Sequence, residues 1–180
     1  MNAMNTHYPE PVRVETVNRH TLAVIVDNEP GALARISGMF SGRGYNIESL
    51  TVSETEEARH LSRITIVTTG TNAVIEQIKA QLDRLVPVHR VVDLTLQGNA
   101  LEREICLVKV VGQGEHRSEA LRLAAAFGAR TLDATLNSFV FELTGTTEEI
   151  DRFIRLMSVI GLVEICRTGI AAMGRGAEPL

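Results

Sequence analysis

The sequence predicts an α+β fold made of two tandem βαββαβ units, which is the ferredoxin-like arrangement. Strand and helix periodicities follow one another in the same order in each half of the chain, and the pair Gly70-Thr71 in the first half has its counterpart in Gly145-Thr146 in the second. A polar, turn-rich joint at residues 97–99 separates the halves. The 180 residues, 44% of them hydrophobic, are enough to form two small packed cores.

In the first half, apolar residues alternate over residues 21–27, as expected of a strand, and then recur at helical spacing from Leu33 to Phe40. Alternation returns in Ile64 and Ile66, which predicts a second strand of a hairpin. The expected elements of this half are strands at 21–27, 46–53, 61–69 and 88–96 and helices at 33–40 and 74–85.

The second half repeats this order. Gly128 follows the first helix as Gly44 does in the first half, and Thr146 with Glu149 has the spacing of a capping box at the start of the second helix. The expected elements are strands at 103–111, 130–136, 139–144 and 162–168 and helices at 118–127 and around 150–157. We divide the chain into a flexible N-terminal arm (1–19), a first domain (20–97), a second α+β domain (98–173) and a loose tail (174–180).

Composition and charge exclude several classes of protein. The formal net charge of −4 argues against a nucleic-acid-binding surface, which needs clustered basic residues. No run approaches the roughly 20 apolar residues of a membrane-spanning helix, and no signal peptide is recognisable, so we expect a cytoplasmic protein without membrane or nucleic-acid partners. Cys106 and Cys166 stand in apolar strand-like runs and are expected to be buried, reduced thiols.

Several strands carry apolar residues on both faces, such as Leu22 with Ile25 and Val91 with Val92. Helices on one face of a sheet leave its other face open, and exposed apolar strands tend to associate. We therefore expect a second chain to cover an edge or a face, most simply in a homodimer.

The corner between the first strand and the first helix has the chemistry of a carboxylate site. Pro30 suits the first helical turn, where its missing N–H would have no partner. Gly31 has no side chain, so the backbone N–H groups of Gly31, Ala32 and Leu33 are expected to lie open at the positive end of the helix dipole.

Two asparagines complete an amino-acid-binding chemistry. Asn28 precedes the corner and Asn46 stands at the head of the next expected strand, and each offers an amide oxygen that can accept a hydrogen bond from an ammonium group. With the carboxylate on the helix amides, these groups fit a free α-amino acid, and Leu33 and Ile47 would contact its side chain.

The same residues also suit an ordinary strand-to-helix turn. In that interpretation Asn28 only caps the helix, Gly31 only relieves crowding, and Asn46 is a turn residue at the start of a strand. Local chemistry alone favours the turn over the ligand site.

A longer sequence pattern favours the ligand site over the ordinary turn. The spacing Asn28-x-x-Gly31-x-Leu33 is followed by the run Arg43-Gly44-Tyr45-Asn46-Ile47-Glu48-Ser49-Leu50. The pattern resembles the ACT domain of the small, regulatory subunit of acetohydroxyacid synthase (acetolactate synthase), and the second run is the more specific to this family. The resemblance continues through Ser62-Arg63-x-Thr65-Ile66-Val67, Val91-Val92-Asp93-Leu94, Glu102-Arg103-Glu104 and Glu164-Ile165-Cys166-Arg167-Thr168-Gly169.

This resemblance implies a non-catalytic subunit of branched-chain amino-acid biosynthesis. Such a subunit activates the catalytic subunit of acetolactate synthase and confers feedback inhibition by valine or another branched-chain amino acid. The resemblance places thiamine diphosphate, Mg²⁺ and FAD on the catalytic partner and no cofactor on this chain. It also implies a homodimer through the ACT domains, with the effector between Asn28, Gly31, Ala32 and Leu33 of one chain and Asn46 and Ile47 of the other.

Two alternative functions differ from this interpretation. Catalysis by this chain is disfavoured because its five histidines are dispersed, with no metal-ligand spacing, and no serine sits in a nucleophile elbow, so we expect no catalytic and no metal-binding residues. The other alternative is a free-standing tandem ACT-type sensor that regulates a different enzyme or a transcription factor. The specific run at residues 45–50 and the lack of a basic helix-turn-helix segment argue against it.

Overall fold

The computed structural model describes residues 16–56, 60–96, 98 and 100–180. Its first half consists of β1 (Asn18–Asp27), α1 (Ala32–Gly42), β2 (Ser49–Glu56), β3 (Leu61–Gly70), α2 (Asn72–Leu82) and β4 (Val88–Asp93). Its second half consists of β5 (Leu101–Val111), α3 (Glu115–Phe127), β6 (Arg130–Ala134), β7 (Ser138–Gly145), α4 (Thr147–Ile160) and β8 (Leu162–Arg167), followed by β9 (Ala171–Met173).

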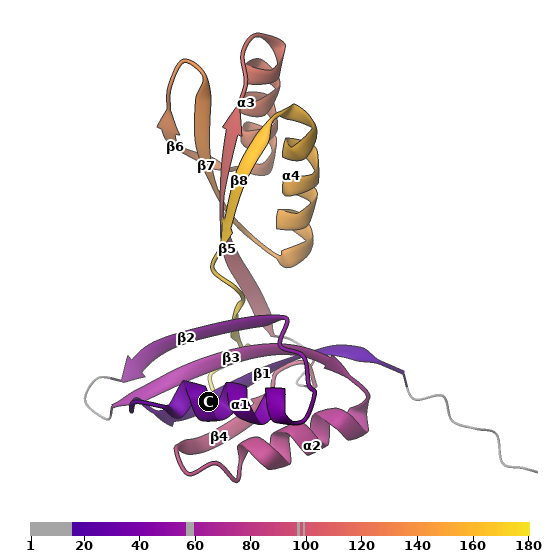
Figure 1. Cartoon of the computed structure of the whole chain (residues 1–180), viewed down its shortest axis with the longest axis vertical. Helices are drawn as coiled ribbons and strands as arrows, with labels where there is room; N and C mark the ends of the chain where they lie inside the picture. Colours follow the sequence, from indigo (N-terminus) through magenta and orange to yellow (C-terminus); the bar gives the residue numbers. More distant parts are fainter. Residues whose placement is uncertain (1–15, 57–59, 97, 99) are drawn as a thin grey trace, which may run out of the picture.

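The strand orders are β2-β3-β1-β4 in the first sheet and β6-β7-β5-β8 in the second, and all neighbouring strands are antiparallel. Each unit therefore has the βαββαβ topology with its first and third strands in the centre, which confirms the predicted fold class. Figure 1 shows two bodies, each with its pair of helices on one side of its sheet.

Each half has its own apolar core between sheet and helices. In the first half, Leu22, Val24 and Val26 point from β1 toward Ile36 and Phe40 of α1. Because side chains alternate along a strand, these residues of β1 share the face that the helices cover. The second core is built in the same way, with Phe141 of β7 and Phe153 of α4 fully buried within it.

The open faces of the two sheets differ. On the first sheet, Ala23, Val67 and Leu94 form an apolar cluster with Ile170 and Ala172, so part of the expected cover comes from the chain itself and not from a second chain. The pairing of β9 with the first residues of β5 places this segment there, and neither β9 nor its position was predicted.

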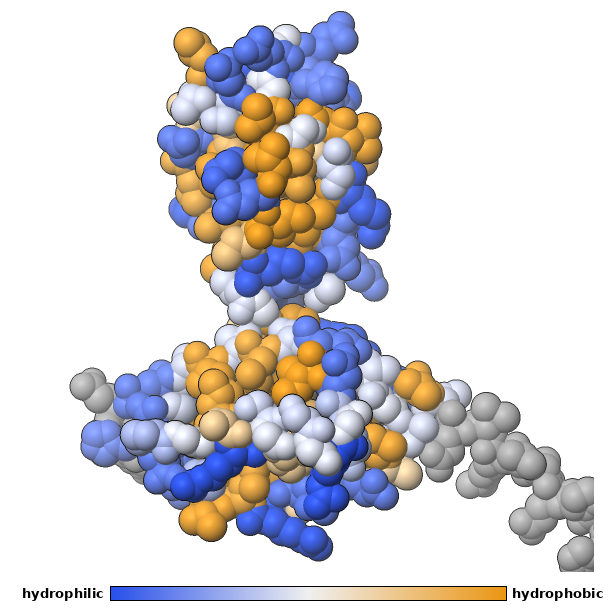
Figure 2. All heavy atoms as spheres, viewed as in Figure 1, coloured by the Kyte–Doolittle hydropathy of each residue, from blue (hydrophilic) through white to orange (hydrophobic). Residues whose placement is uncertain are grey.

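The second half keeps large apolar side chains at its surface, including Ile105, Val111, Leu132 and Val163. Figure 2 shows hydrophobic residues gathered over this half on the face that is in view. Within the described residues, no helix has both the length and the apolar character needed to cross a membrane.

Several expected elements differ from the observed ones by up to three residues at an end, and two of these differences concern the candidate site and the end of the first sheet. The strand expected at 46–53 begins at Ser49, so Asn46 and Ile47 precede it, and the strand expected to reach residue 96 ends at Asp93. The capping box is present as expected: the Thr146 amide donates to Glu149 Oε2 (2.8 Å) and the Glu149 amide donates to Thr146 Oγ1 (3.3 Å).

We expect Thr146→Ala to lower the free energy of unfolding by about 1 kcal/mol in urea titrations, because the first turn of α4 loses its cap. Thr146→Ser keeps the hydroxyl and should unfold like the parent chain. Bonds from the Thr146 amide and hydroxyl lower the pKa of Glu149 below its ordinary 4.5, so its contribution is complete above that pH and is lost as the pH falls through the lowered value. In acid the difference between the two variants should therefore narrow by what the bond from the Thr146 hydroxyl to the Glu149 carboxylate contributes, whereas the bond from the Glu149 amide to the cap hydroxyl does not titrate and keeps the rest of the difference. A difference that stays the same across this pH range would contradict this account.

Candidate functional site

The first corner of the candidate site lies where β1 ends. The Asp27 amide donates to the Pro87 carbonyl (2.8 Å) and the Asn28 amide to the His60 carbonyl (2.6 Å), so the chain is held from both sides at this point. Asn28 itself is exposed. The first residue before α1 is Gly31, and no side chain caps the helix, so the interpretation of Asn28 as a helix cap is wrong.

Gly31 gives α1 its start. It is the N-cap residue, and its left-handed backbone (φ 90°) is one that residues with a side chain rarely adopt. Pro30 therefore precedes the helix, and the prediction that it stands in the first helical turn is wrong. The Ala32 amide makes a long hydrogen bond to the Glu29 carbonyl (3.3 Å), so it is less open than predicted.

The electrostatics of this corner still favour an anion. No acidic residue stands in the first turn of α1, so the positive end of its dipole is not neutralised from within the helix. Glu29, just before it, is bound by Arg35 (3.1 Å). The side chain of Ala32 is buried, whereas Leu33 is 41% exposed, so only Leu33 of this pair can offer an apolar surface to a ligand.

The second corner lies between α1 and β2. The helix ends at Gly42, and Gly44 (φ 72°) turns the chain so that the Tyr45 amide donates to the Phe40 carbonyl (3.0 Å). Asn46 is exposed, and its carbonyl accepts a hydrogen bond from the Thr68 hydroxyl (2.7 Å). Ile47 is half-buried and packs against the first core. Thr68 was not predicted, because only the folded register brings β3 to this turn.

Within one chain the two corners are far apart. Asn28 follows Asp27, which pairs with Leu61 of β3, whereas Asn46 lies beside Thr68 of the same strand. At about 3.3 Å per residue, the stretch of β3 from Leu61 to Thr68 measures about 23 Å. An α-amino acid is far smaller than this, so no single chain brings the six predicted effector-site residues together.

Comparison with known proteins identifies the family. Residues 22–90 match the family model of the ACT domain of acetohydroxyacid synthase small subunits, and residues 103–176 match that of the small subunit of acetolactate synthase. The probable acetolactate synthase small subunit of Archaeoglobus fulgidus is 45% identical over 158 residues, covering 88% of this chain and 98% of that protein. The chain belongs to the acetolactate synthase small-subunit family.

Other members of the family and one solved structure support this assignment. The isozyme 3 small subunit of Escherichia coli is 44% identical over 159 residues, which cover 88% of this chain and 96% of that protein. The crystal structure of the acetolactate synthase small subunit from Thermotoga maritima superposes with a TM-score of 0.81 at 35% identity, covering 89% of this chain and 99% of that one. The ACT domain and the link to branched-chain amino-acid biosynthesis follow from this membership.

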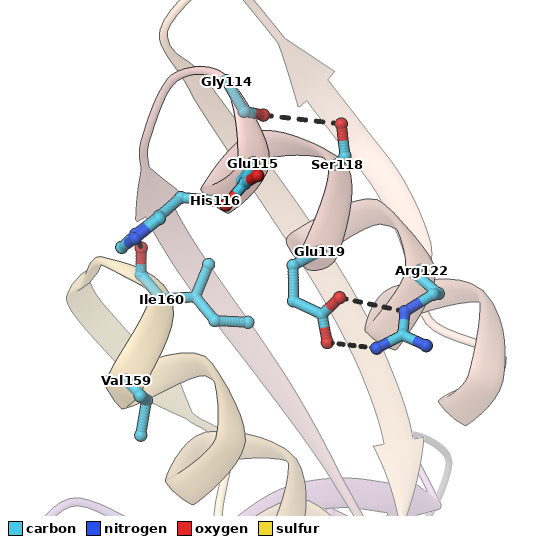
Figure 3. Close-up of a pocket in the computed structure, with 8 residues that line it drawn as sticks. All are labelled: Gly114, Glu115, His116, Ser118, Glu119, Arg122, Val159 and Ile160. Atoms are coloured by element: carbon cyan, nitrogen blue, oxygen red, sulfur yellow. Dashed lines mark hydrogen bonds and ion pairs between the residues drawn. The ribbon is translucent and has the colours of Figure 1, made fainter.

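A pocket of this family member lies elsewhere, between the start of α3 and the end of α4 (Figure 3). Several of its polar side chains are engaged with neighbours: Glu119 binds Arg122 (2.9 Å), and His116 Nδ1 contacts the Ile160 carbonyl (2.8 Å). None of the six predicted effector-site residues lines it. Over the described residues, no cluster of three or more His, Cys, Asp or Glu side chains could hold a metal ion.

One ionisable pair is buried in the first core. His20 and Asp93 contact each other through Nδ1 and Oδ2 at 2.8 Å, and both residues are at most 5% exposed. Asp93 Oδ1 also accepts a hydrogen bond from the Thr95 amide (2.9 Å), and the Thr95 hydroxyl accepts one from the Thr21 amide (2.9 Å). This network joins β1 to the end of β4, which is the arrangement of a structural pair.

The two cysteines differ, contrary to the prediction that both are buried. Cys106 is buried in β5, and this burial raises the pKa of its thiol to about 11. Cys166 is exposed on β8, an edge strand of the second sheet.

Native protein should therefore react with a thiol reagent only at Cys166, because the Cys106 thiol is buried and protonated near neutral pH. Intact-mass spectrometry should show one added label before unfolding and two after it in urea. Cys166→Ser should remove the native label, and labelling of Cys106 in the folded chain would contradict the assignment.

Proposed function

We propose that this chain is the regulatory subunit of acetolactate synthase, that it activates the catalytic subunit, and that it makes the enzyme sensitive to feedback inhibition by valine. The chain itself does no chemistry, and thiamine diphosphate, Mg²⁺ and FAD stay with the catalytic partner. We place it in the cytoplasm, where it forms a homodimer through its ACT domains.

The observation that carries the proposal is the position of β2 at the edge of the first sheet. β2 begins three residues after Asn46 and runs toward the end of the sheet where Asn28 and His60 meet. An edge strand has a free row of backbone donors and acceptors. If two copies pair antiparallel along β2, a two-fold axis brings the Asn46 corner of each chain to the Asn28 corner of the other.

The paired corners would recognise every part of an α-amino acid. The amides of Gly31 and Leu33 and the positive end of α1 attract the carboxylate. The amide oxygens of Asn28 and of the other chain's Asn46 accept hydrogen bonds from the ammonium group. Leu33 and Ile47 provide the apolar surface that a branched aliphatic side chain prefers.

The magnitudes are adequate for a metabolic sensor. A micromolar dissociation constant corresponds to about −8 kcal/mol, which a carboxylate, an ammonium contact and a buried isopropyl group can provide together. A coupling free energy of about 1–3 kcal/mol between effector and catalytic subunit changes activity roughly 5- to 150-fold.

One reconstitution tests the proposal. The chain is mixed with an acetolactate synthase catalytic subunit from the same cell, and acetolactate formation is measured with and without valine, leucine or isoleucine. We expect stimulation by the chain and inhibition by valine. A chain that binds a branched-chain amino acid but stimulates no such partner would instead be the free-standing sensor.

We expect Gly31→Asp to abolish valine inhibition and to preserve activation, because the new carboxylate repels that of the ligand. Gly31→Ala is the matched control, since it carries the same strain at φ 90° and no charge, and no atom lies within 4 Å of its new Cβ. Full valine sensitivity of Gly31→Asp in the reconstituted assay would refute the site.

Asn46→Ala should weaken calorimetric valine binding by about 1–3 kcal/mol through loss of a charge-assisted hydrogen bond. Asn137→Ala, in the β6–β7 turn of the second half, is the control and should bind like the parent chain. An unaltered isotherm for Asn46→Ala counts against this contact.

Mixed dimers test whether the pocket is shared. A tagged heterodimer of one Gly31→Asp chain and one Asn46→Ala chain should contain one doubly altered pocket and one intact pocket, because each pocket takes its corners from different chains. Calorimetry should then recover one normal valine site per dimer. If both corners of a pocket came from the same chain, no normal site would return.

A further inference from the structure

Two sequence motifs that resemble the family lie outside the Asn28 and Asn46 corners. They are the motif around Arg63 in β3 and the motif that ends in Arg167-Thr168-Gly169, and they come together on the first sheet. We call residues 168–173 the return segment, because they lead the chain from the second half back onto the first sheet. Figure 1 shows the two halves joined where β5 and this segment pass between them.

The return segment is anchored to the second half where it begins. Arg167, the last residue of β8, donates to buried Glu104 (Nε to Oε2, 3.0 Å) and to Asp151 (2.7 Å). The Thr168 amide donates to the Ile105 carbonyl (3.1 Å). These bonds connect the beginning of the segment to β8, β5 and the start of α4.

The same segment is anchored to the first half beside the Asn46 corner. The Ile170 amide donates to the hydroxyl of Ser49, the first residue of β2 (2.9 Å), and Arg63 donates to the Ala172 carbonyl (2.6 Å). The side chains of Ile170 and Ala172 are buried in the cluster on the open face. Burial lowers the pKa of Arg63, yet a guanidinium stays charged at any physiological pH, so this bond persists.

Gly169 sets how closely the segment approaches β2. Its backbone is left-handed (φ 82°), and a Cβ placed there would lie 2.8 Å from Thr51 Oγ1 and 2.9 Å from Ser49 Oγ. Only glycine satisfies both the conformation and the close approach. The approach is to β2, which begins two residues after Ile47.

Few other contacts join the two halves. In the described part of the chain, the extensive packing between helices and strands lies within one half or the other. Where the two halves join, Glu102 of β5 accepts hydrogen bonds from Arg19 (2.9 Å) and Thr21 of β1. This second connection is to β1, whereas the return segment donates its hydrogen bond to Ser49 of β2.

We propose that the return segment couples the effector corner to the second half: a change in β2 when an amino acid binds near Asn46 is transmitted through Ser49 and Gly169 to β8 and the second sheet. The inference rests on the proposed function and adds to it the route by which one half reports on the other. It makes Gly169 and Ala172 coupling residues that contact no ligand.

The first test compares Gly169→Ala with Gly176→Ala in the full chain. Both glycines have positive φ (82° and 98°), so both variants carry backbone strain, but only at Gly169 does the new Cβ meet other atoms. For Gly169→Ala we expect stimulation of the catalytic subunit and calorimetric valine affinity within about threefold of the parent chain, and a valine response reduced to less than about twofold. Gly176→Ala should respond like the parent chain.

The second test loosens the segment by charge. Ala172→Glu places a carboxylate in the apolar cluster, and Ala171→Glu places the same group at an exposed neighbour in β9. Hydrogen exchange should show faster exchange of the Ile170 amide in Ala172→Glu than in Ala171→Glu, together with loss of the valine response in the first variant only.

The outcomes separate this inference from the proposed function. A parent chain that neither binds valine nor stimulates the catalytic subunit overturns the proposed function and, with it, the coupling. If the parent chain is inhibited by valine and Ala172→Glu is inhibited equally although its segment exchanges faster, only the coupling is overturned. Loss of valine binding in both Gly169→Ala and Ala172→Glu also overturns it, because the segment would then support the pocket itself.

Discussion

The antiparallel pairing of β1 with β3 is the constraint on which the candidate site depends. Its register runs without interruption from Asn18 opposite Gly70 to Asp27 opposite Leu61. Because α1 returns over the sheet between β1 and β2, the residues before the helix and those after it must lie at opposite ends of this register. A ligand that needs both corners therefore needs two chains, and the edge position of β2 offers the simplest way to join them.

Two glycines with positive φ illustrate how the same residue serves different purposes. At Gly31 the surroundings are open, so the missing side chain leaves room above the start of α1. At Gly169 the surroundings are close-packed, and the missing side chain allows the return segment to touch β2. The first glycine belongs to the proposed recognition of an amino acid, and the second to the proposed transmission of that event.

Each sheet has one face that its helices leave open, and the apolar residues on these two faces are buried to different extents. The first sheet buries Ala23 and Val67 beneath Ile170 and Ala172 of its own chain. The second sheet has no such segment in the described residues, and apolar side chains such as Ile105 remain exposed. Apolar alternation predicts that a face needs cover, but it cannot predict what provides that cover, because any apolar surface satisfies the same demand.

The sequence by itself determined the order of the elements, the two cores and the capping box of α4, because alternation, helical spacing and capping act over a few residues. It also singled out Asn28, Gly31 and Asn46 as chemistry suited to an amino acid, and the resemblance named the family that the comparisons then showed. Only the tertiary structure decided that Cys166 is exposed, that Thr68 supports the Asn46 turn, and that residues 168–173 lie on the first sheet. These facts depend on register and on contacts between residues far apart in the chain, and no local pattern encodes either.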